Sequence, residues 1–182
     1  MIRVIAGKYR HIKLEQPNID STRPTTDKVR EAVFSSLQFK LEGKSCLDLF
    51  SGSGAWAIEA ASRGAQDVVA LDLNKIAYRT IVNNVKIVKA DNISVLNTDA
   101  RNFVTRNSQP FDFIFIDAPF KQTQMVNEIL KTLAHKETLN ADGEIIIETD
   151  VADLIEVPER YRIFKEKRYG KINLIYLCRA ED

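Results

Sequence analysis

From residue 44 onward, short apolar runs alternate with longer amphipathic stretches. Apolar runs bounded by turn residues predict strands, whereas apolar positions spaced three and four apart predict helices. Strands are expected at 46–50, 67–71, 93–96, 111–116 and 144–148, and helices at 55–63, 75–88 and 124–134. Because these strands are apolar on both faces, the pattern predicts an α/β fold with a mostly parallel sheet covered by helices on both sides.

The last two apolar runs follow a different pattern. Residues 162–168 and 172–178 alternate across Gly170-Lys171, which is typical of a β-hairpin. We therefore expect an antiparallel pair at one edge of the sheet.

The first 43 residues form a separate pattern. Short strands are expected at 2–6 and 11–14, on either side of a turn at Gly7-Lys8. A helix is expected to begin after Thr25 or Thr26, because both can cap its first turn. We predict a basic N-terminal arm over 1–43, made of short strands plus a helix, as an appendage packed on a main domain at 44–182.

Composition narrows the class of protein. The chain has 182 residues, of which 45% are hydrophobic and 28% charged, as in ordinary globular domains. Two cysteines without a CxxC pair and two histidines make no recognisable zinc set, so no metal is expected. The start has no apolar signal segment, and no apolar run approaches the length of a membrane span. We expect a soluble, monomeric cytoplasmic protein with reduced thiols and no membrane contact.

The charge is balanced overall but unevenly distributed. The net charge of +1 excludes a polycation that coats nucleic acid. However, residues 1–44 hold nine basic and five acidic side chains, and a second basic cluster lies between 160 and 171. Tyr9, Tyr161 and Tyr169 lie within these stretches. Basic and aromatic side chains together favour a nucleic-acid surface, although two solvated faces would give the same sequence.

A glycine-rich segment follows the first strand of the main domain. Gly52 and Gly54 lie where this strand should turn into a helix, and Asp72 ends the next strand. Such a turn lets a ligand approach the backbone, and the later carboxylate can bind a ribose diol. Asp48 would repel a pyrophosphate but attract the ammonium of S-adenosylmethionine (AdoMet). The segment favours AdoMet, while an NAD(P)-dependent oxidoreductase or a turn with Asp48 hydrogen-bonded locally stays open.

Two further acidic groups end strands on the same edge of the sheet. Asp99 could accept a hydrogen bond from an adenine amino group, or it could cap the next turn. Asp117, Ala118, Pro119 and Phe120 follow the most strand-like run. The Asp117 carboxylate and the Ala118 carbonyl could accept the protons of an exocyclic base amine, while Phe120 stacks on a flipped base. The alternative is a simple strand end with Phe120 in the core.

The sequence resembles the bacterial 16S ribosomal RNA guanine-N2 methyltransferases that modify guanine 966. The matching segments are Arg3–Arg10, Arg23–Ala32, Asp48–Gly54, Asp117–Phe120 and Lys167–Gly170. The resemblance implies a Rossmann-like class I AdoMet-methyltransferase fold with seven strands, AdoMet as methyl donor, and a guanine of the small ribosomal subunit as acceptor. The family motif is usually Asp-Pro-Pro-Tyr or Asp-Pro-Pro-Phe, so Ala118 is a departure, but its backbone carbonyl is retained.

We therefore predict methylation of the exocyclic N2 of a guanine in 16S rRNA by direct SN2 transfer. Cofactor contacts are expected from Thr25, Thr26, Asp48, Phe50, Ser51, Gly52, Ser53, Gly54, Asp72, Asp99 and Ala100. RNA contacts are expected from Arg3, Lys8, Arg10, Lys13, Arg23, Lys167 and Arg168. The alternatives are an adenine-N6 nucleic-acid methyltransferase and a non-catalytic RNA-binding factor of ribosome assembly.

Overall fold

The computed structural model describes residues 2–19, 27–119 and 121–181. Its main sheet contains β3 (Ser45–Asp48), β4 (Asp67–Asp72), β5 (Ile93–Asn97), β6 (Phe111–Ile116), β7 (Leu139–Thr149), β8 (Tyr161–Tyr169) and β9 (Ile172–Arg179). The helices are α1 (Asp27–Ser36), α2 (Ala55–Ser62), α3 (Lys75–Val88), α4 (Ala100–Arg106) and α5 (Thr123–Lys136), with a short 3-10 turn at Ala152–Leu154. Two short strands, β1 (Ile2–Arg3) and β2 (Lys13–Leu14), pair with each other in a separate antiparallel sheet.

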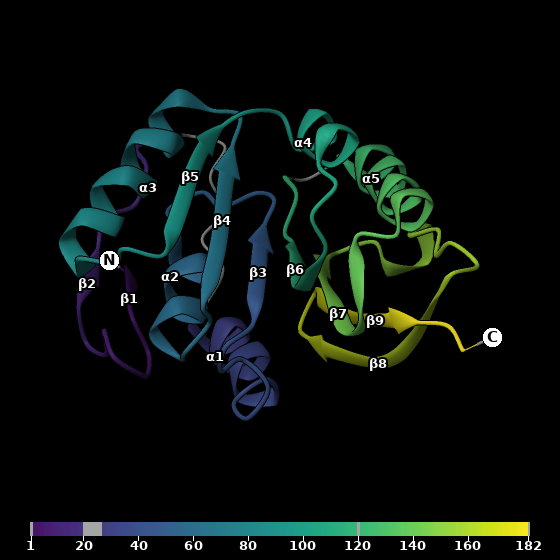
Figure 1. The fold of residues 1–182 in the computed structure, drawn as a ribbon, viewed down its shortest axis with the longest axis horizontal. Coiled ribbons are helices and arrows are strands. Elements are labelled where there is room, and N and C mark those ends of the chain that lie inside the picture. The colour runs from purple at the N-terminus through teal and green to yellow at the C-terminus, as the bar shows by residue number, and fades with distance from the viewer. Residues whose placement is uncertain (1, 20–26, 120, 182) are drawn as a thin grey trace.

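The seven strands are ordered β5-β4-β3-β6-β7-β9-β8 (Figure 1). Every neighbouring pair from β5 to β7 is parallel, whereas β9 is antiparallel to both of its neighbours. The predicted α/β sheet with an antiparallel final hairpin is therefore confirmed. The reversed strand is β9, which lies second from the edge, so the edge strand β8 itself runs with the parallel strands.

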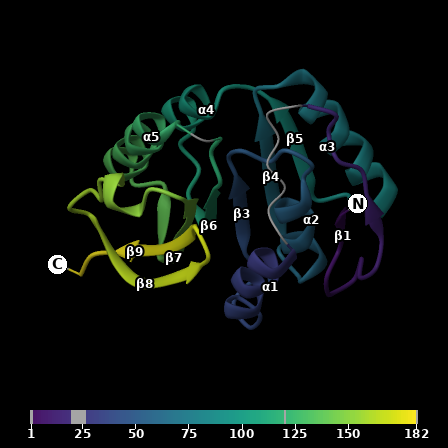
Figure 2. The ribbon, with the colours of Figure 1, turned by 180° about the vertical axis from the view of Figure 1, so that it is seen from behind.

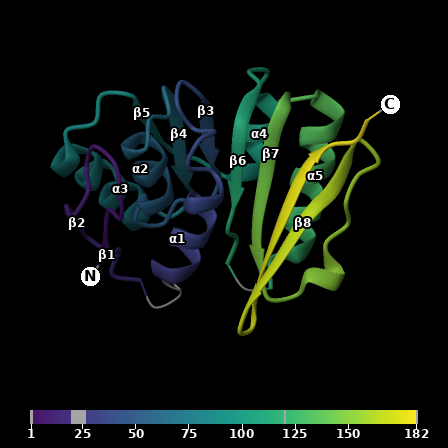
Figure 3. The same ribbon diagram turned by 90° about the horizontal axis from the view of Figure 1, so that it is seen from below.

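Successive side chains of the central strands point to opposite faces, and each face is covered. On β6, Phe113 and Phe115 join a core with α1, α2 and α3, whereas Ile114 and Ile116 join a core with α4 and α5. Figures 2 and 3 show the helices on the two sides of the sheet. This two-sided burial explains why the strands read as continuous apolar runs rather than alternating ones.

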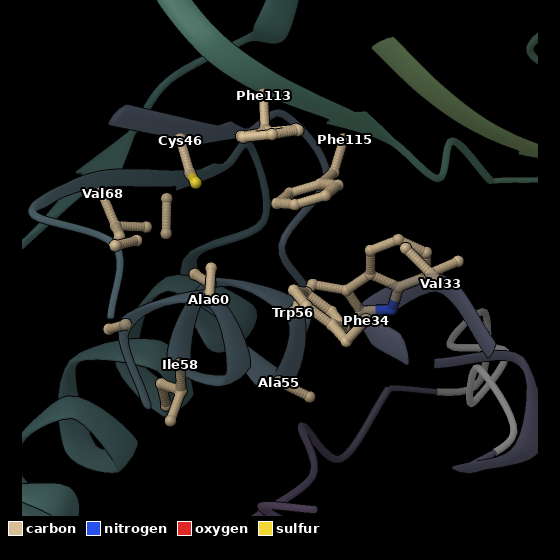
Figure 4. Close-up of a cluster of buried hydrophobic side chains, with 14 of the residues drawn as sticks. Val33, Phe34, Cys46, Ala55, Trp56, Ile58, Ala60, Val68, Phe113 and Phe115 are labelled. Atoms are coloured by element: carbon tan, nitrogen blue, oxygen red, sulfur yellow. The ribbon is translucent and has the colours of Figure 1, made fainter. Parts of the chain in front are cut away.

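An aromatic cluster fills the first core below the carboxyl end of β6 (Figure 4). The ring centroid of Trp56 lies 5.8 Å from Phe34 and 5.4 Å from Phe115, both edge to face, and the Phe34 and Phe115 centroids are 5.5 Å apart. Such contacts add about 0.5–1.5 kcal/mol per pair beyond area burial. The cluster fixes α1 and α2 against the strand that ends at Asp117.

The N-terminal arm is docked on α2 by hydrogen bonds to two buried side chains. Glu59, which is 0% exposed, accepts from the backbone N–H of Ile5 at 2.8 Å and of Ala6 at 3.1 Å. Ser62 Oγ accepts from the Tyr9 N–H at 2.9 Å. Arg63 Nε donates to Glu59 at 2.8 Å, so the buried carboxylate has both hydrogen bonds and a counter-charge.

Two of the three tyrosines in the basic stretches are buried, so they do not add aromatic side chains to a nucleic-acid surface. Tyr9 and Tyr161 are each 6% exposed and belong to the two cores. Each lies at an apolar position of a segment that packs on the body, where burying a large ring is more favourable than exposing it. Tyr169 is half-buried and packs against the first core.

Other differences concern element boundaries. The helix α4 was not predicted, because seven residues form only about two turns and are too short to show a repeating helical pattern. The arm strands are shorter than expected, at two residues each. Cys46 is buried, Cys178 is half-buried, and both thiols are free. Within the described ranges, no helix is long and apolar enough to cross a membrane, and no group of three or more His, Cys, Asp or Glu side chains could hold a metal ion.

Candidate active site

A cavity of about 480 Å³ lies at the carboxyl ends of the central parallel strands. Its wall is formed by the segments that follow β3, β4, β5 and β6. The N-terminal arm adds residues from α1, from β1 and from the segment after β2. The lining includes Phe50, Ser51, Gly52, Ser53, Asp72, Asp99, Ala100, Asp117, Ala118 and Pro119. Ligands of open α/β sheets bind at this edge, so most of the predicted site residues are brought together.

The turn between β3 and α2 depends on glycine. Gly52 has φ +60° and Gly54 has φ +84°, a region that side chains with a Cβ rarely adopt. A Cβ at Gly54 would lie 3.1 Å from Ile81 Cγ2, whereas nothing lies within 4 Å of the Cβ position at Gly52. Gly54 therefore allows α3 to pack closely behind the turn, and Gly52 leaves open space beside the cavity.

Asp72 connects the glycine-rich turn to the end of β4. Its carboxylate accepts from the Gly52 N–H at 3.0 Å and from the Asn74 N–H at 2.9 Å. The side chain is half-buried and lines the cavity. Two backbone donors thus hold this carboxylate at the wall, where its remaining lone pairs can accept from a ligand's hydroxyl groups.

Asp48 and Gly54 are not among the residues that line the cavity, and their contact with the cofactor stays a prediction. Asp48 is 2% exposed and accepts from Ser51 Oγ at 2.8 Å, so it lies beneath the turn and is hydrogen-bonded locally. Burial, with a smaller contribution from the charges of Asp117 and Asp72, raises the pKa of Asp48 to about 7, although the Ser51 hydrogen bond opposes this shift. Gly54 directly precedes α2, and its Cβ position faces Ile81 of α3.

Asp99 both caps a helix and lines the cavity. It accepts from the Arg101 N–H at 2.7 Å and the Asn102 N–H at 3.4 Å at the start of α4. Hydrogen bonds from the Arg101 side chain lower the pKa of Asp99. The two roles expected for Asp99 are therefore compatible. The carboxylate that caps α4 stays ionised, and at the cavity wall it can also accept a hydrogen bond from a ligand.

The segment after β6 places Asp117 on the same strand face as Phe113 and Phe115, because side chains alternate along a strand. Asp117 and Ala118 are half-buried, Pro119 is exposed, and all three line the cavity. Ala118 also packs against the core under α5. Asp117 thus lies above the aromatic cluster. Phe120, Thr25, Thr26 and Arg23 fall outside the residues that the structure describes.

The predicted RNA-binding side chains lie in two separate places. Arg3, Lys8, Arg10 and Lys13 are exposed on the arm, and Lys167 and Arg168 are exposed on β8. The arm and β8 lie at opposite ends of the main sheet in all views (Figures 1, 2 and 3). The structure therefore does not bring the two basic groups together into one patch.

Several residues at the cavity wall were not predicted from the sequence. Arg30 is 1% exposed, donates to the Arg3 carbonyl at 2.6 Å and to Asp27 at 3.1 Å, and has its pKa lowered chiefly by burial. Trp56, Gln16, Pro17 and Ile19 also line the cavity. The burial of Arg30 could have been predicted from its position on the apolar side of α1, one turn before Phe34.

Comparisons with known proteins agree with this geometry. Residues 2–178 match the family described as "Conserved hypothetical protein 95". The chain is 33% identical over 172 residues to "Ribosomal RNA small subunit methyltransferase D" of Escherichia coli, covering 94% of this chain and 86% of that protein. It is 33% identical over 180 residues to the protein of the same name from Buchnera aphidicola, covering 97% and 93%. A solved structure, "Putative methyltransferase yhhF from Escherichia coli", superposes with a TM-score of 0.89 at 31% identity, covering 100% and 99%. The expected methyltransferase fold is confirmed.

Proposed function

The chain belongs to the "Conserved hypothetical protein 95" family, and on this premise we propose that it is an AdoMet-dependent methyltransferase of small-subunit ribosomal RNA. We further propose that the acceptor is the exocyclic N2 of a guanine in 16S rRNA, at the position that corresponds to guanine 966. The observation that supports this most directly is the placement of Asp117 and Ala118 in the same cavity wall as the glycine-rich turn and Asp72.

The described residues fit AdoMet. The open space at Gly52 admits a ligand against the backbone, Asp72 can accept from ribose hydroxyls, and Asp99 can accept from the adenine amine. At the α1 side of the cavity, Arg30 Nε and Trp56 Nε1 are buried N–H donors that have no partner among the described residues. Such donors suit the methionine carboxylate. When bound there, AdoMet supplies an electrophilic methyl group.

Asp117 and Ala118 would act on the acceptor amine. The lone pair of a guanine N2 is delocalised into the ring, so the amine is a poor nucleophile. A carboxylate oxygen and a backbone carbonyl that accept its two protons favour a pyramidal nitrogen with an available lone pair. These hydrogen bonds strengthen as positive charge develops on the nitrogen. Pro119 restricts Ala118 to extended backbone and so helps to fix its carbonyl.

Exposed basic side chains would position the RNA for methyl transfer. The exposed arm side chains Arg3, Lys8, Arg10 and Lys13 can bind phosphates without sequence preference, as can Lys167 and Arg168. Because these groups lie at opposite ends of the sheet, we propose that they contact different parts of the RNA.

The test is methyl transfer from labelled AdoMet to small subunits that lack this modification. Wild-type protein should place label on one guanine N2 of 16S rRNA, and Asp117→Ala should reduce the rate by at least about a hundredfold. Asp91→Ala, which changes an exposed aspartate between α3 and β5, should leave the rate unchanged. Label on an adenine N6, or AdoMet binding without any label in RNA, would contradict the proposed acceptor.

A further inference from the structure

The arm contributes directly to the wall of the cavity. Gln16, Pro17 and Ile19, which follow β2, line the cavity together with the glycine-rich turn. The same arm presents the exposed basic side chains proposed to bind RNA. One segment of the chain therefore has an RNA-facing surface and a cavity-facing surface.

Asn84 of α3 connects this segment to the glycine-rich turn. Its side chain is 0% exposed. The amide nitrogen donates to the Ser53 carbonyl at 2.7 Å and to the Glu15 carbonyl at 2.8 Å, and the amide oxygen accepts from the Glu15 N–H at 2.8 Å. Both N–H groups are used and the oxygen is paired, so one buried amide joins the turn at residue 53 to the arm at residue 15.

The same face of α3 supports the turn by packing. Ile81 lies three residues before Asn84, and residues three apart on a helix share a face. Ile81 Cγ2 would be 3.1 Å from a Cβ at Gly54. Movement of the turn relative to α3 would therefore break a buried hydrogen bond and a close packing contact together, which favours a concerted shift over an independent one.

We propose that Asn84 is a positioning residue that couples RNA binding by the arm to cofactor binding at the glycine-rich turn. This inference rests on the proposed function. RNA that fixes the arm also fixes the wall formed by Gln16, Pro17 and Ile19, and Asn84 transmits the constraint to Ser53. Because such coupling is reciprocal, cofactor in the cavity orders the arm to the same extent in free energy.

The first test measures binding of S-adenosylhomocysteine, which lacks the transferable methyl group, by equilibrium dialysis with and without small subunits. In the wild type, subunits should tighten binding about fivefold or more. In Asn84→Ala, this factor should fall below about twofold. Asn83→Ala is the matched control, because Asn83 is exposed and bonds the Glu15 carboxylate at 2.7 Å without reaching the turn. It should retain the wild-type factor.

A second test uses the wild-type chain and AdoMet alone, so it can overturn the proposal even if Asn84→Ala does not fold. Hydrogen exchange at the Glu15 amide, which donates to Asn84, should slow when the cavity is saturated with AdoMet. Exchange at the Val68 amide, which bonds the Asn92 carbonyl at 3.0 Å at the far end of β4, should not change. Unchanged exchange at Glu15, or full coupling in Asn84→Ala, overturns the proposal. Absence of methyl transfer by the wild type would instead overturn the proposed function.

Discussion

Asp48→Asn tests how much the glycine-rich turn depends on a buried carboxyl. The side chain is 2% exposed, and burial raises its pKa from 3.8 to about 7. A folded pKa above the unfolded value means that the native state retains a proton that the unfolded chain has lost. Asp48 therefore costs no stability below pH 3.8, and the free energy of unfolding falls as the pH rises from there to about 7.

The magnitude follows from the two pKa values. One pKa unit corresponds to about 1.36 kcal/mol, so the full loss is at most about 4 kcal/mol, and structural relaxation around the charge reduces it. Asparagine is uncharged, and its single amide oxygen remains as an acceptor for the two donors to Asp48, which are the Ser51 hydroxyl and the Ala57 N–H. We expect Asp48→Asn to lack this part of the pH dependence and to gain stability relative to the wild type as the pH rises.

The assay is urea unfolding of both proteins from pH 4 to pH 8.5, with the difference between them plotted against pH. Subtraction removes the titration of groups that both proteins share. The difference should rise through this range by roughly 2–4 kcal/mol in favour of the variant. A difference that stays constant with pH would refute the argument. AdoMet affinity measured at the same pH values separates stability from binding, since a carboxylate that attracts the cationic cofactor should give the wild type the tighter binding above pH 7.

Other parts of the molecule give further predictions. Gly7→Ala should destabilise the arm by at least about 2 kcal/mol, because Gly7 has φ +88° and its Cβ would lie 2.0 Å from the Ser62 carbonyl oxygen; limited proteolysis of the arm and urea unfolding would detect this. Glu59→Gln should cost about 2–3 kcal/mol in urea unfolding, because it removes the charge paired with Arg63 and places N–H groups against donors; unchanged stability would mean that the arm is held elsewhere. Charge reversal of Lys8 and Arg10 together should raise the KM for small subunits and flatten its salt dependence, while AdoMet affinity measured without RNA stays the same; equal loss of both would contradict the separation of roles.

Much of the fold could be predicted because the signals were local. Phe111–Ile116 is apolar except for Asp112, and the strand has these bounds. The acidic residues at strand ends were identifiable because parallel strands bring their carboxyl ends to one edge, as the cavity lining at Asp72, Asp99 and Asp117 shows. The sequence pattern could also separate the final hairpin from the parallel strands.

What could not be predicted depends on partners far apart in the chain. Asn84 looks like an ordinary polar residue of a helix, and its importance follows only from contacts with Glu15 and Ser53. Tyr9 lies among basic residues but packs in the core through tertiary contacts that composition does not show. Asp48 lies at the expected point of the turn, yet its side chain is directed beneath the backbone, and no spacing in the sequence distinguishes that direction from one into the cavity.

Trp56 allows the site to be followed by intrinsic fluorescence. The chain contains one tryptophan, and its indole forms part of the cavity wall while packing against Phe34 and Phe115. Tryptophan emission depends on the polarity and hydrogen bonding around the ring, so selectively excited fluorescence from this protein has a single source, and that source is at the site. Ligand entry can therefore be followed in unmodified protein, without a label and on the timescale of stopped-flow mixing.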